Sequence, residues 1–380
     1  MNSPNEDESS HGRADAESGA SKIPKQLGGL QKTITMAQIA KAAGVSQGAI
    51  SSLLNDRDYG IRVSERTRER VFKVCREMGY IPNDLRAVVR MYPEVGDFCL
   101  LMASGYDTGM HDPLAPRLVS AAMAAVSDDA HPLTLANYET SANYRAGHKD
   151  LPHPLRSGVC SKFLIYGPPN ASLSETFAER GIPVVSLGHE VASHGVLSLL
   201  FDYSLASRMA VSHLFQLGHQ RLGIVSGPFG STDPKILDFN RGVLLAHELQ
   251  NLPIEGQNII QGDLSIRAGH AAFDELFSRN PRPTAIFCMS DTAAIGVLFQ
   301  AQARGIKVPE ELSIIGCSDN PGLLWTNPQL TTVHLPAEEM AELGVKEISR
   351  MVGEGAASAA RNTFLPPRLV ERGSCVAMGR

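Results

Sequence analysis

The chain has 380 residues, 43% of them hydrophobic, and a formal net charge of −5. This length allows two or three domains with large apolar cores, and the overall charge argues against a uniformly basic nucleic-acid-binding protein. Six cysteines without paired spacing predict free or buried thiols in a reducing compartment. The chain has no long apolar run and no secretory signal, so we expect a cytoplasmic, nucleoid-associated protein without a membrane segment.

The charge is unevenly distributed along the chain. From Lys32 to Tyr92 there are eleven Lys or Arg against six Asp or Glu, a local charge of +5, so the remainder carries −10. A basic module on an acidic body predicts that one end of the protein contacts DNA. Residues 1–31 are polar and offer little to bury, so we expect a disordered tail.

Two short helical patterns follow the tail, between Ile34 and Asn55. In the first, Thr35 is a plausible N-cap and the apolar residues share one face; in the second, the N-cap is Ser46. Gly44 lies between them and permits a sharp bend. The spacing predicts a helix-turn-helix, in which the second helix enters the major groove.

The outward face of the second helix carries small polar side chains and no carboxylate. It consists of Gln47, Gly48, Ser51 and Ser52. Such a face can approach phosphates and base edges closely. The alternative is an ordinary helical hairpin with a serine-rich solvent face. A third helix, capped by Ser64 and ending at Gly79, adds basic residues that favour phosphate contacts.

The order of these motifs closely resembles the headpiece of LacI/GalR-type bacterial transcription regulators. The resemblance rests on ITMAQIAKAAGVS, SSLLN, VSERTRERV and GYIPN. It places Gln47, Gly48 and Ser52 at base-contacting positions. It places the phosphate contacts at Thr35, Ser46, Ser51 and Asn55, and the wider DNA-binding set also includes Arg62, Tyr80, Asn83 and Arg86.

The resemblance also implies a hinge helix in residues 82–90 that folds only when two subunits occupy one operator. In the family a leucine of this helix wedges into the minor groove, and here that position is Val89. A valine reaches less far between bases. This shorter side chain, Asp84 and a longer loop at 56–62 are departures from the family pattern. They predict that the operator DNA is bent less than is typical of the family.

From Val95 onward, apolar strands alternate with helices, as in parallel α/β sheets. The expected strands are 97–103, 131–136, 161–166, 182–187, 197–201, 221–226, 258–261, 284–289 and 312–317. The expected helices are 114–127, 204–217, 239–250, 266–279, 291–304 and 337–352. No glycine-rich phosphate loop is present, so no nucleotide cofactor is expected.

The family resemblance continues through this region in PTAIFCMSDTAAIG, VPEELSIIG and PQLTTV. It implies an N-terminal all-α helix-turn-helix headpiece followed by an α/β, periplasmic-binding-protein-like effector domain with two lobes. We expect the headpiece at 32–80 and the hinge at 81–92. The N-terminal lobe is expected at 93–218 and 335–355, and the C-terminal lobe at 219–334 and 356–380.

The effector cleft departs from the family pattern. Phe239 stands where the family has a ligand-gripping arginine, and Ser318 where it has an aspartate. The remaining candidates for effector contacts are Asp112, Ser290, Asp291 and Trp325. Rather than a free monosaccharide, we expect either an effector, such as a carbohydrate derivative, with an apolar or aromatic portion resting on Phe239 and Trp325, or a regulator with little small-molecule control. Asp291 has an alternative role as a helix cap, and Trp325 an alternative place in the core.

Metal and catalytic motifs are not evident in the sequence. His148 and His153 lie in a proline-rich loop without a recognisable ligand spacing, so no metal site is expected. The sequence therefore predicts a homodimeric regulator, most simply a repressor, with operator double-stranded DNA and a small-molecule effector as partners. The alternatives are a solute-binding protein without DNA function and an α/β enzyme.

Overall fold

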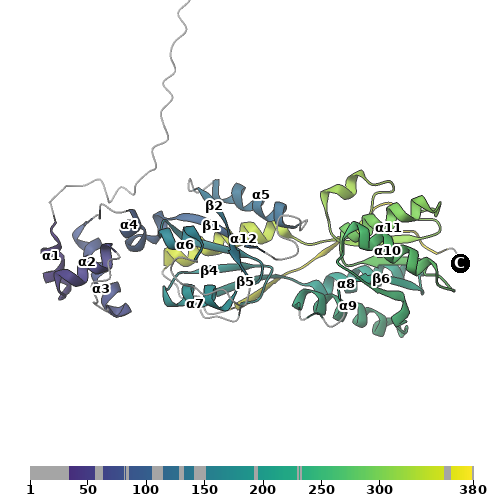
Figure 1. Cartoon of the computed structure of the whole chain (residues 1–380), viewed down its shortest axis with the longest axis horizontal. Helices are drawn as coiled ribbons and strands as arrows, with labels where there is room; N and C mark the ends of the chain where they lie inside the picture. Colours follow the sequence, from purple (N-terminus) through teal and green to yellow (C-terminus); the bar gives the residue numbers. More distant parts are fainter. Residues whose placement is uncertain are drawn as a thin grey trace, which may run out of the picture. The chain divides into compact units, whose positions relative to one another are not determined.

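The chain forms two compact units in the computed structural model, one ending at Met91 and the other beginning at Tyr92 (Figure 1). The structure describes residues 34–55, 63–80, 82, 85–104, 114–127, 132–140, 151–191, 196–228, 231, 233–354 and 361–378. The predicted tail at 1–31 lies outside these residues. None of the helices among them is long and apolar enough to cross a membrane.

The described part of the first unit is entirely helical. Its helices are α1 (Met36–Ala43), α2 (Gln47–Asn55), α3 (Glu65–Met78) and α4 (Leu85–Met91). Helix α1 packs against both α2 and α3. The buried side chains at the centre of the unit are Ile39, Ile50, Leu54, Val71 and Cys75.

Local sequence signals set the ends of these helices, as predicted. Thr35 and Gln38 form a capping box, in which the Thr35 amide donates to Gln38 Oε1 at 2.8 Å. Gly44 ends α1 with a φ of 64°, a left-handed conformation that glycine adopts without strain. The Ala49 amide then donates to Ser46 Oγ at 3.1 Å, so Ser46 caps α2.

Two arginines hold α4 in the first unit. Arg90 Nη2 donates to the carbonyl of Leu54 at 2.8 Å, at the C-terminal end of α2. Arg76 of α3 donates through Nη1 to the carbonyl of Met91, also at 2.8 Å. Cations are favoured at helix C-termini, because the last carbonyls lack helical partners. Each arginine thus supplies donors that the end of a helix needs.

The second unit contains two six-stranded sheets. The first has the order β11-β5-β4-β3-β1-β2, and all its strands are parallel. Its strands are β1 (Asp97–Ser104), β2 (Leu133–Glu139), β3 (Cys160–Tyr166), β4 (Val184–Leu187), β5 (Val196–Phe201) and β11 (Arg361–Leu365).

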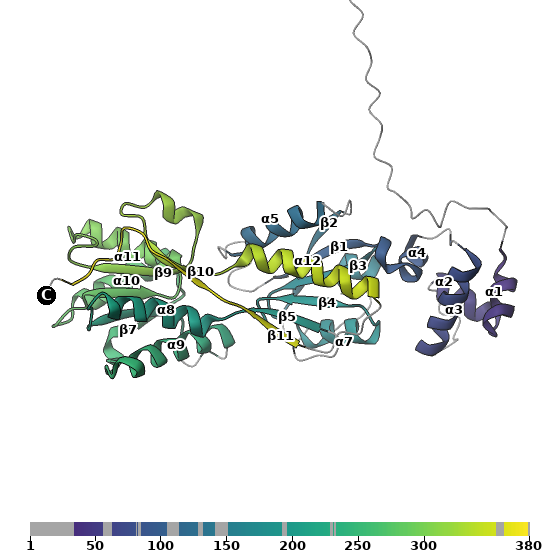
Figure 2. The same ribbon diagram turned by 180° about the vertical axis from the view of Figure 1, so that it is seen from behind.

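Helices cover both faces of the first sheet, so its inner strands β1, β3, β4 and β5 are buried almost throughout, while the edge strands β2 and β11 are partly exposed. Phe98 and Leu100 of β1 face one core, while Cys99 and Leu101 face the other. The first core includes α5 (Leu114–Ser127) and α12 (Ala337–Glu354), which lie side by side in Figure 1 and Figure 2. The second includes α6 (His153–Ser157) and α7 (Ala171–Glu179).

The second sheet has the order β12-β10-β9-β8-β6-β7, with only β12 antiparallel among the described strands. Its strands are β6 (Leu222–Ser226), β7 (Ile259–Gln261), β8 (Ala285–Cys288), β9 (Ser313–Ser318), β10 (Thr331–His334) and β12 (Arg368–Val370). One face is covered by α8 (Tyr203–Gln216) and α9 (Pro234–Gln250). The other is covered by α10 (Ile266–Phe277) and α11 (Asp291–Ala303).

The lobe boundaries differ from prediction at two elements. Helix α8, assigned to the N-terminal lobe, packs against α9 and the second sheet. Strand β11, assigned to the C-terminal lobe, pairs with β5 in the first sheet. The chain therefore passes between the sheets after β5, after β10 and after β11. Helix α8 belongs with the second sheet because it approaches α9 very closely. A Cβ atom added to Gly242 of α9 would lie 2.0 Å from the carbonyl oxygen of Ser204 in α8.

Most of the expected elements are confirmed, with several additions. Helix α7 was missed because only Leu173 and Phe177 mark its buried apolar face. Helix α9 begins earlier than predicted, with Asp233 as N-cap and Pro234 at its first position. Strands β10, β11 and β12 were also missed. All six cysteines are free thiols, and all but the half-buried Cys375 are buried, as expected.

Candidate functional site

The surface of α2 carries the residues expected to contact DNA. Ala49, Ile50, Leu53 and Leu54 are buried, which turns Gln47 outward together with the partly exposed Gly48, Ser51 and Ser52. The exposed end of the helix is therefore polar, small and free of carboxylates. Such a surface can enter a major groove, with Gln47 as the longest side chain able to reach a base edge.

The other expected DNA contacts are distributed over three elements. Thr35 and Ser46 are exposed, and both side chains also accept a hydrogen bond from the helix that follows them. Arg86 of α4 is exposed, whereas Tyr80 is half-buried and its amide donates to the carbonyl of Cys75 at 2.9 Å. Arg62 and Asn83 lie outside the described residues, as does the side chain of Asn55.

Val89 is buried in this structure, and its expected role as a wedge in operator DNA stays a prediction. It is only 5% exposed, and Ala87 and Met91 on the same short helix are also buried. Helix α4 packs against α2, and Arg90 is bonded to the Leu54 carbonyl. Insertion of Val89 between base pairs would require α4 to turn or leave this position.

The expected effector residues that the structure describes follow the carboxyl ends of β6, β8 and β9, and ligands bind at this edge in open α/β sheets. The carboxyl edges of the two sheets are linked by Arg117 of α5. Its Nη1 donates at 2.6 Å to the carbonyl of Ser318 at the end of β9. Its guanidinium also forms two hydrogen bonds with Glu338 of α12, at 2.7 Å and 2.6 Å.

Asp291 is fully buried and its oxygens are used within the protein. Oδ1 accepts from Thr332 Oγ1 at 2.6 Å, and Oδ2 accepts from Ser318 Oγ at 3.1 Å and from the Asn320 amide at 2.7 Å. Burial raises the pKa of Asp291 to about 6, although these three hydrogen bonds act to lower it. Asp291 therefore holds α11, β9 and β10 together and has no surface for an effector.

The expected capping role of Asp291 is also wrong, because Ser290 is the N-cap of α11. Ser290 Oγ accepts from the amides of Thr292 and Ala293, at 3.1 Å and 3.3 Å. Its hydroxyl also donates to the carbonyl of Leu264 at 3.2 Å. Ser290 thus has a structural role. Asp112 lies outside the described residues.

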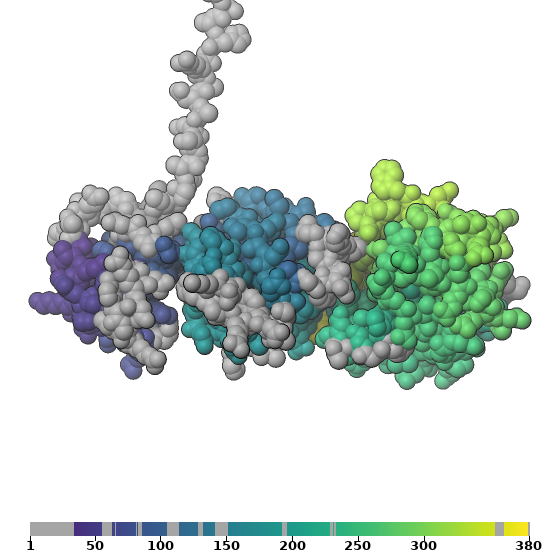
Figure 3. Space-filling model, in the orientation of Figure 1, coloured from purple at the N-terminus to yellow at the C-terminus, as the bar shows by residue number. Residues whose placement is uncertain are grey.

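Phe239 and Trp325 do not form a shared aromatic platform. Phe239 is 1% exposed and its ring packs against Tyr203 with centroids 4.9 Å apart, so it belongs to the core between α8 and α9. Trp325 is 90% exposed, at the end of the 3₁₀ helix η5 (Pro321–Trp325). Figure 3 shows the yellow-green segment that contains η5 projecting from the surface. The core alternative for Trp325 is therefore wrong, and its role in effector binding stays a prediction.

Two known protein families match parts of this chain. Residues 35–83 match the description "Bacterial regulatory proteins, lacI family", and residues 211–375 match "Periplasmic binding protein-like domain". The HTH-type transcriptional repressor CytR of Escherichia coli strain K12 is 28% identical over 359 residues, which cover 90% of this chain and 97% of CytR. The HTH-type transcriptional regulator DegA of Bacillus subtilis strain 168 is 29% identical over 346 residues, covering 90% of this chain and 97% of DegA.

The chain is a lacI-family DNA-binding transcription regulator. Solved structures agree with the fold at lower identity. A transcriptional regulator CelR–cellobiose complex has a TM-score of 0.62 at 24% identity, covering 90% of this chain and 99% of CelR. The lac repressor dimer bound to operator and the anti-inducer ONPF has a TM-score of 0.60 at 22% identity, covering 91% of this chain and all of the repressor chain.

Sequence reasoning missed three polar residues near the strand ends of this lacI-family regulator. Lys235 and Asp238 lie in the first turns of α9, directly after β6. Lys235 Nζ lies 5.5 Å from the centroid of the Tyr203 ring, and burial raises the pKa of Asp238. Arg117 is the third, and as the one charged residue of α5 it could have been recognised in the sequence.

A cavity of about 190 Å³ lies elsewhere in the regulator, beside β6, β7 and the C-terminal end of α9. Its lining includes His247 and Asn258, whose Nε2 and Oδ1 atoms lack partners among the described residues. Burial lowers the pKa of His247 and so favours the neutral ring. The cavity contains none of the expected effector residues.

Proposed function

We propose that this regulator is a repressor, which binds a palindromic operator as a homodimer with an affinity set by a small effector. The observation that carries the proposal is the exposed polar face of α2, which Ser46 caps and the buried Ile50 and Leu54 orient. The repressor assignment is supported by full-length similarity to CytR, itself named a repressor. A palindromic site follows from the two-fold symmetry of a dimer that carries two headpieces.

A solute-binding protein without DNA function is the weaker alternative. It would account for the two sheets but leaves the capped helix-turn-helix at the N-terminus without a role. An enzyme is weaker still, since the matched relatives are transcription regulators.

The proposed effector is not a free monosaccharide. Phe239 occupies the position of the family arginine and is buried against Tyr203, while the Ser318 hydroxyl donates to Asp291. Neither supplies the charged group that would bind sugar hydroxyls, and an unpaired hydroxyl in a closed cleft is costly. We propose Lys235 and Asp238 as the polar side chains that contact the effector.

The homodimer proposal is supported by an exposed apolar pair on η5. Leu324 and Trp325 are adjacent and are 52% and 90% exposed. Tryptophan is enriched at the centres of protein interfaces, where its large surface is removed from water. A palindromic operator requires a dimer, so we propose that a second copy of the chain covers this apolar pair.

A mobility-shift titration tests the DNA-binding proposal. The full chain is titrated against DNA from upstream of its own gene and, after footprinting, against symmetric and half-site versions of the protected sequence. We expect tight binding to the symmetric site and at least tenfold weaker binding to the half-site. Equal affinity for the protected and scrambled sequences would contradict the proposal.

Thermal shifts test the effector proposal separately from DNA binding. We expect no stabilisation by millimolar glucose, ribose or galactose. A shift of several degrees with any of these sugars would contradict the proposed site. A compound found by wider screening should lose its shift in Lys235→Ala or Asp238→Asn, whereas Glu342→Gln, which changes an exposed carboxylate on α12, is the control.

A further inference from the structure

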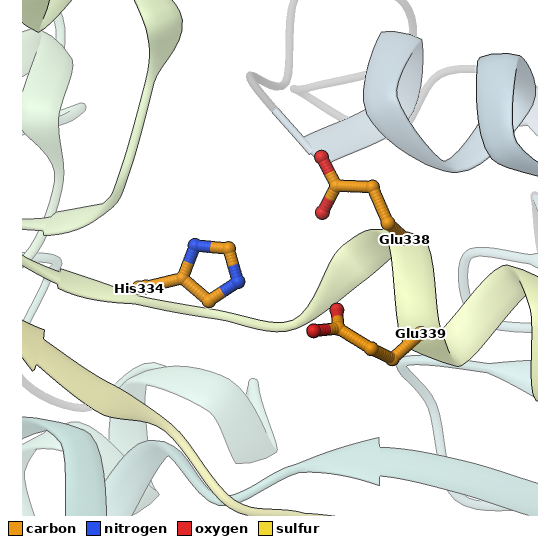
Figure 4. A group of neighbouring side chains, drawn as sticks. All are labelled: His334, Glu338 and Glu339. Carbon is orange, nitrogen blue, oxygen red and sulfur yellow. The ribbon is translucent and has the colours of Figure 1, made fainter.

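Three potential metal ligands meet where the chain passes from the second sheet to the first. His334 is the last residue of β10, and Glu338 and Glu339 lie in the first turn of α12. One ligand atom from each lies within 4.8 Å of the other two. Figure 4 shows the imidazole ring facing the space between the two carboxylates. Acidic residues in a first helical turn are common, so the two glutamates alone would not define a site.

The hydrogen bonds of His334 fix its tautomer. Nδ1 lies 2.9 Å from Asp319 Oδ2, and the other oxygen of Asp319 accepts from Arg372. Both oxygens of the Asp319 carboxylate are therefore acceptors, one facing His334 and the other facing Arg372. A carboxylate only accepts, so Nδ1 carries the proton. Arg117 Nη2 lies 3.4 Å from the same nitrogen, a longer contact that does not change this assignment.

The opposite nitrogen of the ring, Nε2, is therefore the ring atom left to bind a further partner. His334 is 7% exposed, and Nε2 has no hydrogen-bond partner among the described residues. A buried imidazole nitrogen without a partner is costly, and a metal ion between it and the two carboxylates would bind all three groups.

We propose that His334 Nε2, Glu339 and Glu338 bind a divalent transition-metal ion such as Zn²⁺ or Co²⁺. One imidazole nitrogen and two carboxylates form a ligand set typical of these ions, with water completing the coordination. The Asp319–His334 hydrogen bond supplies the outer support that metal-binding histidines usually have. No spacing motif in the sequence indicates this set, because His334 and the glutamates belong to different elements.

Binding requires a small rearrangement of the carboxylates. Ligand atoms on one Zn²⁺ ion are roughly 3–3.5 Å apart, so the three groups must move closer together. Glu339 can do so, because it is exposed and has no partner among the described contacts. Glu338 is held by Arg117 but retains further lone pairs, so we expect it to be the weakest ligand. The bound ion would join the end of β10 to the start of α12 and stiffen the passage between the sheets.

Calorimetric titration of the full chain, stripped with a chelator, tests the proposal. We expect ZnCl₂ to bind at one site that Glu339→Gln weakens at least tenfold and His334→Gln weakens further. Glu310→Gln and His153→Gln remove an exposed carboxylate and an exposed imidazole elsewhere, and should bind Zn²⁺ as the unmodified chain does. CoCl₂ should give a visible absorption spectrum that is lost in the same two variants.

Several outcomes would overturn the assignment. These are a titration without heat, Zn²⁺ binding unchanged in Glu339→Gln, or MgCl₂ binding as tightly as ZnCl₂, which would leave no role for the imidazole. Glu339→Gln changes an exposed side chain, so its result does not depend on how well His334→Gln folds. The titration contains no DNA, so its result is independent of the proposed operator binding.

Discussion

At the scale of the residue, Gln47 is the most informative side chain of the DNA-binding surface. It lies at the exposed start of α2, and its amide can form two hydrogen bonds with one adenine edge. We expect Gln47→Ala to cost roughly 1–3 kcal/mol on the preferred operator and to relax preference at one symmetric base pair. Selection from a random DNA pool measures both effects.

Lys41, which is exposed in the last turn of α1, is the control for Gln47. Lys41→Ala should weaken binding to all sequences alike and reduce its salt dependence, because a lysine–phosphate contact carries no sequence information. A Gln47→Ala profile identical to that of the unmodified chain would contradict the assignment of Gln47.

Asp291 predicts a specific pH dependence of stability. Its pKa is about 6 in the folded chain, against an ordinary value of 3.8, because burial disfavours the charged form. The folded state therefore binds this proton more tightly than the unfolded state. The resulting stabilisation is complete below pH 4 and is lost as pH rises through 6, by an amount on the order of 3 kcal/mol.

Urea unfolding at several pH values between 4 and 6.5 measures this contribution. Asp291→Asn cannot titrate, so its free energy of unfolding should lack that decrease. It should also be less stable at low pH, because an amide cannot accept from Thr332, Ser318 and Asn320 together. Glu342→Gln should retain the slope of the unmodified chain. An equal slope in Asp291→Asn would show that Asp291 is ionised throughout this range.

At the scale of the element, local signals explain which helices and strands the sequence predicted. The capping residues Thr35 and Ser46 lie next to the helices they cap, so a short window contains the whole interaction. The central strands β1, β3, β4, β5, β6, β8 and β9 were recognised for a similar reason, since burial on both faces makes them largely apolar runs.

The site residues were harder to predict, because their partners are distant in sequence. Arg117 bonds to residues 201 and 221 positions away, and Asp291 to residues 27, 29 and 41 positions away. Nothing in the neighbourhood of Asp291 distinguishes a buried structural carboxylate from one that faces a ligand. Phe239 was misjudged similarly, since its position in the family motif does not reveal that Tyr203 covers it.

Helix α4 depends on contacts with the other helices of its unit. With only seven residues, α4 is too short to be stable alone, so Arg90 should contribute strongly to its folding. We expect Arg90→Ala to remove about 1–2 kcal/mol of local stability by removing a charged donor from the Leu54 carbonyl. Amide exchange at residues 87–91 without DNA should become correspondingly faster.

Arg70→Ala is the matched control, because Arg70 is exposed on α3. It should leave exchange in α4 unchanged. Arg76→Ala should act as Arg90→Ala does, because Arg76 bonds to the carbonyl of Met91. Equal protection in all four proteins would show that the arginines do not hold α4.

At the scale of the whole molecule, the two sheets are linked by buried polar contacts close to the chain crossings. Arg117 connects α5 of the first lobe to Ser318 of the second, while Asp319 contacts His334 and Arg372 within the second lobe, beside the crossing after β10. In the proposed dimer, an effector that alters the Arg117 contact would act on both lobes. We propose this contact as a physical basis for effector control of the two headpieces.

Dimer formation determines whether two headpieces can occupy one operator, and Trp325 is the side chain on which we expect it to depend. We predict that Trp325→Ala raises the dimer dissociation constant by tenfold or more, because a buried interface tryptophan typically contributes about 2 kcal/mol or more. Sedimentation velocity over a range of concentrations measures the constant directly. Operator binding by the variant should then become steeply dependent on protein concentration, while binding to a half-site stays the same. Leu249→Ala removes another exposed apolar side chain, on α9, and should change neither property. A dimer equally stable in Trp325→Ala and the unmodified chain would place the interface on another surface.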